Sequence, residues 1–240
     1  GLMAGEAREL NAGFVSRVER GRPLLRLKLA ASLDGRTALA SGESRWITGE
    51  AARADVQRLR ARAGAVMTGI GTVLADDPRL DLRLPGASRQ PLRVVLDRSL
   101  ALPPAARILD APGETLVLTA AAEDGRADAL RARGARVERV PEAGRGLDLG
   151  AVLARLAALG VNELMVEAGP TLAGALLEAG LVDELVLYLA PVMLGPDARP
   201  LAALPAPADM AGRLGFETRD LRRLGADLRL TLVPAAARSA

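Results

Sequence analysis

The only lysine of the chain is the first candidate for chemistry. Lysine and arginine together number 32, yet Lys28 is the one lysine, so arginine supplies the positive charge everywhere else. An ammonium, unlike a guanidinium, can shift its pKa and release a proton. Lys28 lies between Leu27 and Leu29, where a buried ammonium requires a carboxylate or an anionic ligand. It is therefore a candidate catalytic cation, with a structural ion pair or exposure at a sheet edge as the alternatives.

A second candidate follows an apolar segment that ends in Glu167. The chain then passes through Gly169 and Pro170 into a stretch of small residues. A helix N-terminus there offers unpaired N–H groups and the positive end of the helix dipole, which favours a phosphate. Glu167 would lie where open α/β sheets place ligands and is an available partner for Lys28. The alternative is a tight turn whose small residues serve packing, because the pattern matches neither common nucleotide motif.

A third candidate, residues 68–83, joins a strand to a helical turn through two glycines. Thr72 can donate or accept a hydrogen bond in this turn, and Arg83 offers a planar fork for a phosphate. The alternative is that Asp76 and Asp77 only end the turn before a proline and that Arg79 and Arg83 are solvated.

These residues have to be positioned by strands that alternate with helices. Aliphatic runs predict strands at 24–31, 65–70, 92–97, 115–119, 136–140, 163–167, 184–190 and 228–233. Helices are expected at 49–63, 123–133, 149–159 and 171–179, with a helical turn at 71–78 that a proline stops. The alternation predicts an α/β fold with a mainly parallel central sheet and helices on both faces. The last strands lack an intervening helix, which indicates antiparallel C-terminal edge strands.

Composition excludes several classes of function. The chain has 240 residues, half of them hydrophobic, and contains neither histidine nor cysteine. Disulfides, thiolate nucleophiles, imidazole catalysis and the usual zinc or haem ligands are therefore excluded, and no metal site is expected. The net charge is +3 and the sequence contains no long basic run, so no nucleic-acid partner is expected. No apolar run is long enough for a membrane span, which predicts a single-domain cytoplasmic protein with no membrane partner.

Four motifs together resemble the reductase domain of the bifunctional bacterial riboflavin-biosynthesis deaminase/reductase. They are LKLAASLDGRT at 27–37, SGESRWIT at 41–48, TVLADDP at 72–78 and VEAGPTL at 166–172. The resemblance implies a dihydrofolate-reductase-like fold for residues 22–240. It also implies a homodimer that uses NADPH to reduce a phosphorylated pyrimidine, 5-amino-6-(5-phosphoribosylamino)uracil, to 5-amino-6-(5-phosphoribitylamino)uracil.

The same resemblance implies an organisation for the N-terminus. Residues 1–21 are expected to be a linker or tail that follows a missing deaminase domain. The family's deaminase uses histidine and cysteine to bind zinc, and this chain has neither.

The resemblance further implies a set of site residues. Lys28 and Glu167 would be catalytic: Lys28 stabilises the charge that develops on the sugar oxygen, and Glu167 holds and tunes the ammonium. The residues expected to contact NADPH are Ala30, Trp46, Thr72, Asp76, Arg98, Gly169, Pro170, Thr171, Leu172, Ala173, Gly174 and Ala175. The residues expected to bind the substrate are Ser44, Arg60, Leu80, Arg83 and Glu167, with both arginines on the 5′-phosphate.

Two other functions stay open from the sequence. Dihydrofolate reduction shares the expected fold, but it gives no reason for two arginines placed to bind a sugar phosphate. A non-catalytic nucleotide-binding module would bind NADPH without turnover.

Overall fold

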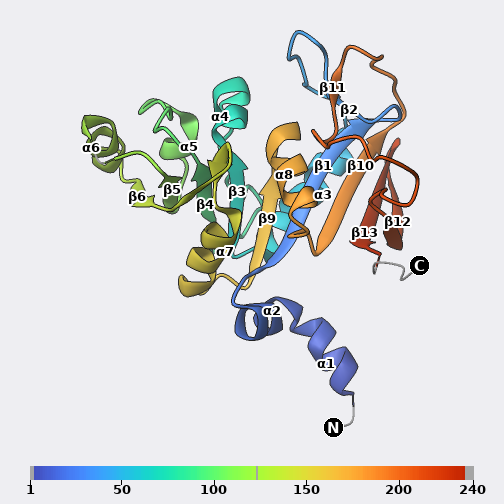
Figure 1. Cartoon of the computed structure of the whole chain (residues 1–240), viewed down its shortest axis with the longest axis horizontal. Coiled ribbons are helices and arrows are strands. Elements are labelled where there is room, and N and C mark those ends of the chain that lie inside the picture. The colour runs from blue at the N-terminus through green and yellow to red at the C-terminus, as the bar shows by residue number, and fades with distance from the viewer. Residues whose placement is uncertain (1–2, 123, 236–240) are drawn as a thin grey trace. The chain divides into compact units, whose positions relative to one another are not determined.

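The computed structural model describes residues 3–122 and 124–235 (Figure 1), and contacts within the chain divide it into two compact units. Unit 1 holds the described residues up to Leu24 together with Leu59–Met165. Unit 2 holds Leu25–Arg58 and the described residues from Val166 onward. Each unit is therefore assembled from two separate stretches of the chain. Strand β1 (Leu24–Ser32), helix α3 (Glu50–Arg62) and strand β9 (Glu163–Glu167) carry the chain from one unit to the other.

Unit 1 contains a run of parallel strands connected by helices. In spatial order the strands are β3 (Ala65–Gly69), β4 (Leu92–Leu96), β5 (Thr115–Thr119) and β6 (Arg136–Arg139). The helices are α4 (Ile70–Asp76), α5 (Arg107–Asp110), α6 (Gly125–Ala132) and α7 (Leu149–Ala158), and a hairpin of β7 (Glu142–Ala143) and β8 (Gly146–Leu147) precedes α7. Every residue of β5 is buried, as expected for the aliphatic strands of a parallel sheet.

Two N-terminal helices also belong to unit 1, α1 (Ala4–Leu10) and α2 (Ala12–Arg20). Helix α2 approaches the start of β9 at Gly13, where an added Cβ would lie 2.6 Å from Cγ of Glu163. Arg17 donates from Nε to the side-chain oxygen of Asn162 at 2.6 Å. Most of the segment expected to be a linker or tail is thus helical, and α2 packs at Gly13 and Arg17, whereas no residue of α1 is buried.

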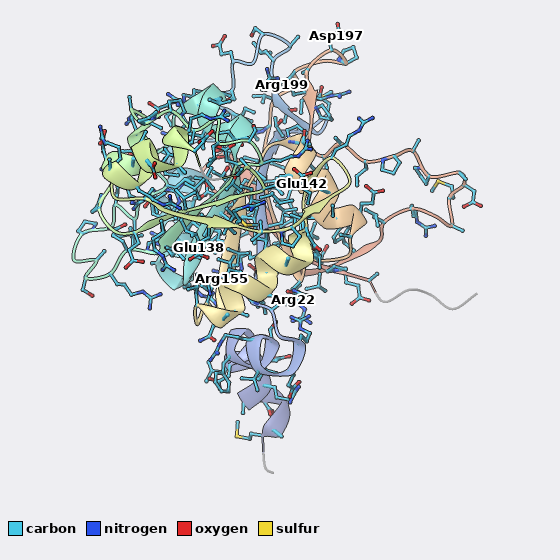
Figure 2. All side chains as sticks on the ribbon, turned by 60° about the vertical axis from the view of Figure 1, so that its left-hand side comes forward. Arg22, Glu138, Glu142, Arg155, Asp197 and Arg199 are labelled. Atoms are coloured by element: carbon cyan, nitrogen blue, oxygen red, sulfur yellow. The ribbon has the colours of Figure 1, made fainter. Side chains whose placement is uncertain are left out.

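An arginine of α7 fixes that helix to strand β6. Arg155 donates from Nε and Nη2 to the carboxylate of Glu138, at 2.6 and 3.0 Å (Figure 2). Arg136 donates to the same carboxylate at 2.7 Å. The hydrogen bond from Arg155, followed by that from Arg136 and the two positive charges, holds the pKa of Glu138 below its usual value against the effect of burial. Such two-point geometry makes this pair more directional than a single surface contact.

Strand β4 carries a buried arginine. The Arg93 side chain is 1% exposed, and its guanidinium donates to the carbonyl oxygens of the segment that precedes β5. The acceptors are the carbonyls of Ile108 at 3.1 Å, Ala111 at 3.0 Å, Gly113 at 2.8 Å and Pro112, together with the hydroxyl of Thr115 at 3.0 Å. All of them are neutral, and burial lowers the pKa of this guanidinium. Arg93 therefore organises a turn by satisfying main-chain groups.

Unit 2 contains one parallel strand pair extended by antiparallel strands. Strand β1 pairs in parallel with β10 (Glu184–Ala190), which pairs antiparallel with β13 (Asp227–Pro234), and β13 pairs antiparallel with β12 (Phe216–Leu224). The short strands β2 (Arg36–Ala38) and β11 (Arg199–Pro200) form a separate pair. Helix α8 (Pro170–Glu178) follows β9, and the first part of α3 also belongs to this unit.

The expected α/β class, mainly parallel with antiparallel C-terminal edge strands, is confirmed. The expected helical turn at 71–78 ends earlier, because Asp77 adopts a left-handed conformation (φ 41°) and closes α4 one residue before the proline. Strand β12 was not expected, because its sequence FETRDLRRL is charged and mostly exposed. The expected helix at 123–133 spans Gly125–Ala132, and Glu123 lies outside the described residues.

Candidate functional site

Strand β1 presents Lys28 on the face opposite its neighbouring leucines. Side chains alternate along a strand, so Lys28 and Ala30 share one face while Leu27 and Leu29 share the other. The two leucines are buried, and Lys28 and Ala30 are half-buried. The Lys28 Nζ lies 5.7 Å from the centroid of the Tyr188 ring of β10. The ammonium thus stands beside an aromatic ring within unit 2.

The Tyr188 hydroxyl belongs to a buried polar network. It donates to Oδ2 of Asp55 in α3 at 2.8 Å, and Arg229 of β13 donates to the same oxygen at 2.9 Å. Arg229 also donates to Asp220 of β12 at 2.8 Å. Burial, the hydrogen bond to Asp55 and the charges of Asp55 and Glu167 together raise the pKa of Tyr188 far above its ordinary value, although Arg229 opposes them. The phenol therefore stays neutral at physiological pH.

Glu167 ends strand β9, and α8 begins soon after it. Gly169 is the N-cap and provides no side-chain acceptor. The first hydrogen bond of the helix runs from the Ala173 N–H to the Gly169 carbonyl at 3.1 Å, so the N–H groups of Thr171 and Leu172 have no acceptor within the helix. No acidic residue occupies the first turn. These free donors and the helix dipole suit a diphosphate, so the residues of this turn fit a dinucleotide cofactor.

Part of the small-residue pattern in α8 serves packing. An added Cβ at Gly174 would lie 2.1 Å from the carbonyl oxygen of Ala203, and the Ala203 N–H donates to the Pro170 carbonyl at 2.9 Å. The segment around residue 203 therefore runs directly against the first half of the helix. The packing interpretation is therefore correct for Gly174, whereas phosphate binding at the first turn stays a prediction.

We expect Gly174→Ala to lower the free energy of unfolding by about 1 to 3 kcal/mol, because the new methyl group must displace main-chain atoms. Urea denaturation followed by circular dichroism measures this change. Gly71→Ala in α4 is the matched control, since nothing lies within 4 Å of its added Cβ and alanine favours a helix by up to about 1 kcal/mol. Equal effects of the two substitutions would contradict the packing role of Gly174.

The segment between β2 and α3 carries Ser44 and Trp46. Trp46 is 70% exposed, and its ring centroid lies 4.6 Å from the guanidinium carbon of Arg53 and 6.0 Å from that of Arg45. Arg53 is itself held by a 2.8 Å hydrogen bond to the Thr48 carbonyl. An exposed indole supported by cations offers a surface on which a planar ligand can stack. Ser44 is half-buried in the same segment.

In unit 1, the expected substrate residues converge on Asp81. Arg60 donates to the Asp81 main-chain carbonyl at 2.9 Å, and Arg83 donates to its carboxylate at 2.7 Å. Arg79 donates to the other carboxylate oxygen at 2.9 Å. Burial raises the pKa of Asp81, but the Arg79 hydrogen bond and the charges of Arg83 and Arg79 outweigh it, so the net pKa is lowered. The adjacent Leu80 is buried with φ 51°, a conformation that is costly for a bulky residue.

The remaining expected cofactor residues also lie in unit 1. Thr72 and Asp76 are one turn apart on α4, and both are half-buried. Arg98 follows β4 and makes a two-point ion pair with the exposed carboxylate of Glu142 at 2.8 and 3.2 Å. A pocket of about 370 Å³ lies between the residues that follow Arg98 and helix α6, but none of its lining residues is an expected site residue.

Sequence reasoning missed several residues of these clusters. Tyr188 and Asp55 are 133 positions apart, and the partners Arg98 and Glu142 are 44 apart, so no local spacing links them. The one available signal was that Tyr188 is the chain's single tyrosine. Within the part of the chain that the structure describes, no cluster of side chains could hold a metal ion and no helix could cross a membrane.

Known proteins resemble this chain along nearly its whole length. It is 46% identical over 247 residues to riboflavin biosynthesis protein RibD of Escherichia coli (strain K12), a match that covers 98% of this chain and 66% of that protein. Acinetobacter baumannii RibD has a solved structure with a TM-score of 0.83 and 41% identity, covering 96% of this chain and 63% of that one.

The name of a third relative states two enzymatic activities. It is a diaminohydroxyphosphoribosylaminopyrimidine deaminase/5-amino-6-(5-phosphoribosylamino)uracil reductase from Thermotoga maritima, with a TM-score of 0.82 and 25% identity, covering 98% of this chain and 63% of that one. The chain thus spans between 63% and 66% of the length of these three relatives. The model of the RibD C-terminal domain matches residues 23–230, which is most of the chain. The chain therefore belongs to the RibD C-terminal domain family.

Proposed function

We propose that this chain carries the reductase activity of riboflavin biosynthesis, the NADPH-dependent reduction of 5-amino-6-(5-phosphoribosylamino)uracil to its ribityl product. The observation that carries the proposal is the family match over residues 23–230, which includes every expected site residue. The half-buried ammonium of Lys28 and the uncapped N-terminus of α8 support it, because the reaction needs a cation near a developing charge and a place for a cofactor diphosphate.

Lys28 is the proposed catalytic cation. When bound, NADPH would supply the hydride that reduces C1′ of the opened sugar. Lys28 would stabilise the negative charge that develops on the sugar oxygen or quench it by transferring its Nζ proton, which water then restores. Glu167 holds the ammonium and lines the substrate site together with Ser44. The neutral Tyr188 is poorly suited to exchange protons here, because its pKa is strongly raised.

Cofactor binding is assigned to the residues with matching chemistry. The Thr171 and Leu172 N–H groups would receive the diphosphate, and the exposed Trp46 indole would supply a stacking surface. Ala30, Thr72, Asp76 and the rest of the 169–175 turn would complete the cofactor contacts. Arg98 is proposed to bind the adenosine phosphate, which would give a preference for NADPH over NADH.

Arg60, Leu80 and Arg83 are the proposed substrate residues of unit 1. We expect Arg83→Ala to raise KM for the phosphorylated pyrimidine about 10- to 100-fold with a smaller change in kcat, because a hydrogen bond to a charged phosphate is lost. Initial rates at varied substrate concentration measure both constants.

The matched control is Arg79→Ala, because Arg79 donates to the same Asp81 carboxylate but is not an expected ligand. If this control raises KM as much as Arg83→Ala does, the effect comes through Asp81 and the phosphate role of Arg83 is wrong.

A spectrophotometric assay of NADPH consumption tests the proposed function. The phosphorylated ribosylaminopyrimidine should be reduced, whereas dihydrofolate should not. Turnover with dihydrofolate alone would instead identify a dihydrofolate-type reductase, and NADPH binding without turnover would identify a non-catalytic module. We also propose a homodimer, which sedimentation velocity measures directly.

A further inference from the structure

We propose that Tyr188 is a positioning residue for Lys28, with its ring fixing the place and protonation of the ammonium. Only the catalytic role of this contact rests on the proposed function. The contact between the two side chains is a property of unit 2 itself. The Lys28 Nζ lies 5.7 Å from the ring centroid, within the distance at which a cation and an aromatic ring attract each other.

The ring has little freedom to move away from the ammonium. Tyr188 is 1% exposed, and its neighbour Val186, which pairs with Lys28 in the strand register, is also buried. The hydroxyl is anchored to Asp55, and Arg229 donates to the same carboxylate oxygen. Burial in β10 and the hydrogen bond to α3 therefore hold the ring in place beside the ammonium.

The charges around Tyr188 favour a neutral, stationary phenol. Asp55 on α3, Arg229 on β13, Lys28 on β1 and Glu167 at the end of β9 are the charged groups that act on it. Because the hydroxyl donates to a carboxylate, deprotonation would place two negative charges together. The proton therefore stays on the phenol, and the ring is available to Lys28 over the whole working pH range.

The contact should change the protonation equilibrium of Lys28. An aromatic face stabilises the charged ammonium but hardly stabilises the neutral amine. The pKa of a lysine beside a ring is therefore higher than that of a lysine beside an aliphatic side chain. Removal of the ring should lower that pKa by about half to one pH unit.

The chain offers an unusually clean measurement, because Lys28 is its only lysine. Growth with lysine labelled with ¹³C at Cε gives a single protein signal whose chemical shift follows the protonation of Nζ. The titration is compared in the wild-type protein, Tyr188→Phe and Tyr188→Leu. Leu185→Ala is the matched control, since Leu185 is a buried residue on the opposite face of the same strand.

Tyr188→Leu should lower the Lys28 pKa by about half to one unit, while Tyr188→Phe, which keeps the ring, and Leu185→Ala should leave it within about 0.3 unit. In the enzyme assay, Tyr188→Leu should move the alkaline limb of the kcat–pH profile to lower pH by the same amount, and Tyr188→Phe should leave this limb at its wild-type position.

An unshifted pKa in Tyr188→Leu, or an equal shift in Leu185→Ala, overturns the proposal. If the wild-type protein fails to consume NADPH with the pyrimidine, the proposed function fails, while the titration still decides whether the ring controls the ammonium.

Discussion

Lys28→Ala is expected to lower kcat for NADPH-dependent pyrimidine reduction by roughly 10²- to 10⁴-fold. The physical reason is that alanine leaves no cation on this face of β1 to stabilise the charge that develops on the sugar oxygen. NADPH affinity should change little, because the proposed diphosphate donors are main-chain groups of α8. Steady-state kinetics give kcat, and fluorescence of the single tryptophan, Trp46, gives the dissociation constant of NADPH.

Lys28→Arg separates two interpretations of the lysine. Arginine keeps the positive charge but does not release a proton. If charge alone is needed, this variant should recover part of the lost activity; if the amine must transfer a proton, it should stay as slow as alanine. Normal turnover by Lys28→Ala would remove Lys28 from the mechanism altogether.

Arg93→Met should lower the free energy of unfolding by about 3 to 5 kcal/mol, because the carbonyls of the 108–113 segment lose their guanidinium donors and that of Ile108 keeps only the Thr115 hydroxyl. Methionine keeps much of the length and apolar volume of the arginine stem, so the loss reports on the guanidinium. Urea unfolding monitored by circular dichroism provides the measurement.

Arg89→Met is the corresponding control at an exposed position four residues earlier in the chain, where a change within about 0.5 kcal/mol is expected. If the two variants lost the same stability, the buried hydrogen bonds of Arg93 would not be the cause. The result does not depend on whether the chain is an enzyme, so it tests the structure separately from the function.

The sequence predicted most of the regular elements, because burial of a parallel strand requires an aliphatic run. Strands β5, β9 and β10 begin and end at the expected residues. The elements that were not predicted are stabilised by interactions other than the burial of an aliphatic run. Strand β12 is mostly polar and is held by main-chain pairing with β13, and the two-residue strands β7, β8 and β11 are too short to show a pattern.

The candidate site was predictable where local chemistry is distinctive. A single lysine on a strand and a glycine before a small-residue helix both stood out, and the structure places Lys28 half-buried in β1 and Gly169 at the N-cap of α8. The interactions of these residues could not be predicted, since the Lys28 ring contact depends on the pairing of β1 with β10 and the Gly174 contact on a distant loop. The roles of the site residues stay predictions.

The parallel pairing of β1 with β10 has a consequence for the newly made chain. Arg26 and its ion-pair partner Glu184 are 158 positions apart, so β1 leaves the ribosome long before its neighbour is synthesised. At about 5 to 20 residues per second, the delay is roughly 8 to 30 s. During that time the stretch from 59 to 165 can already collapse into strands and helices, whereas the strand that bears the lysine still lacks β10. Chaperone dependence and aggregation during translation should therefore concentrate on the β1 segment.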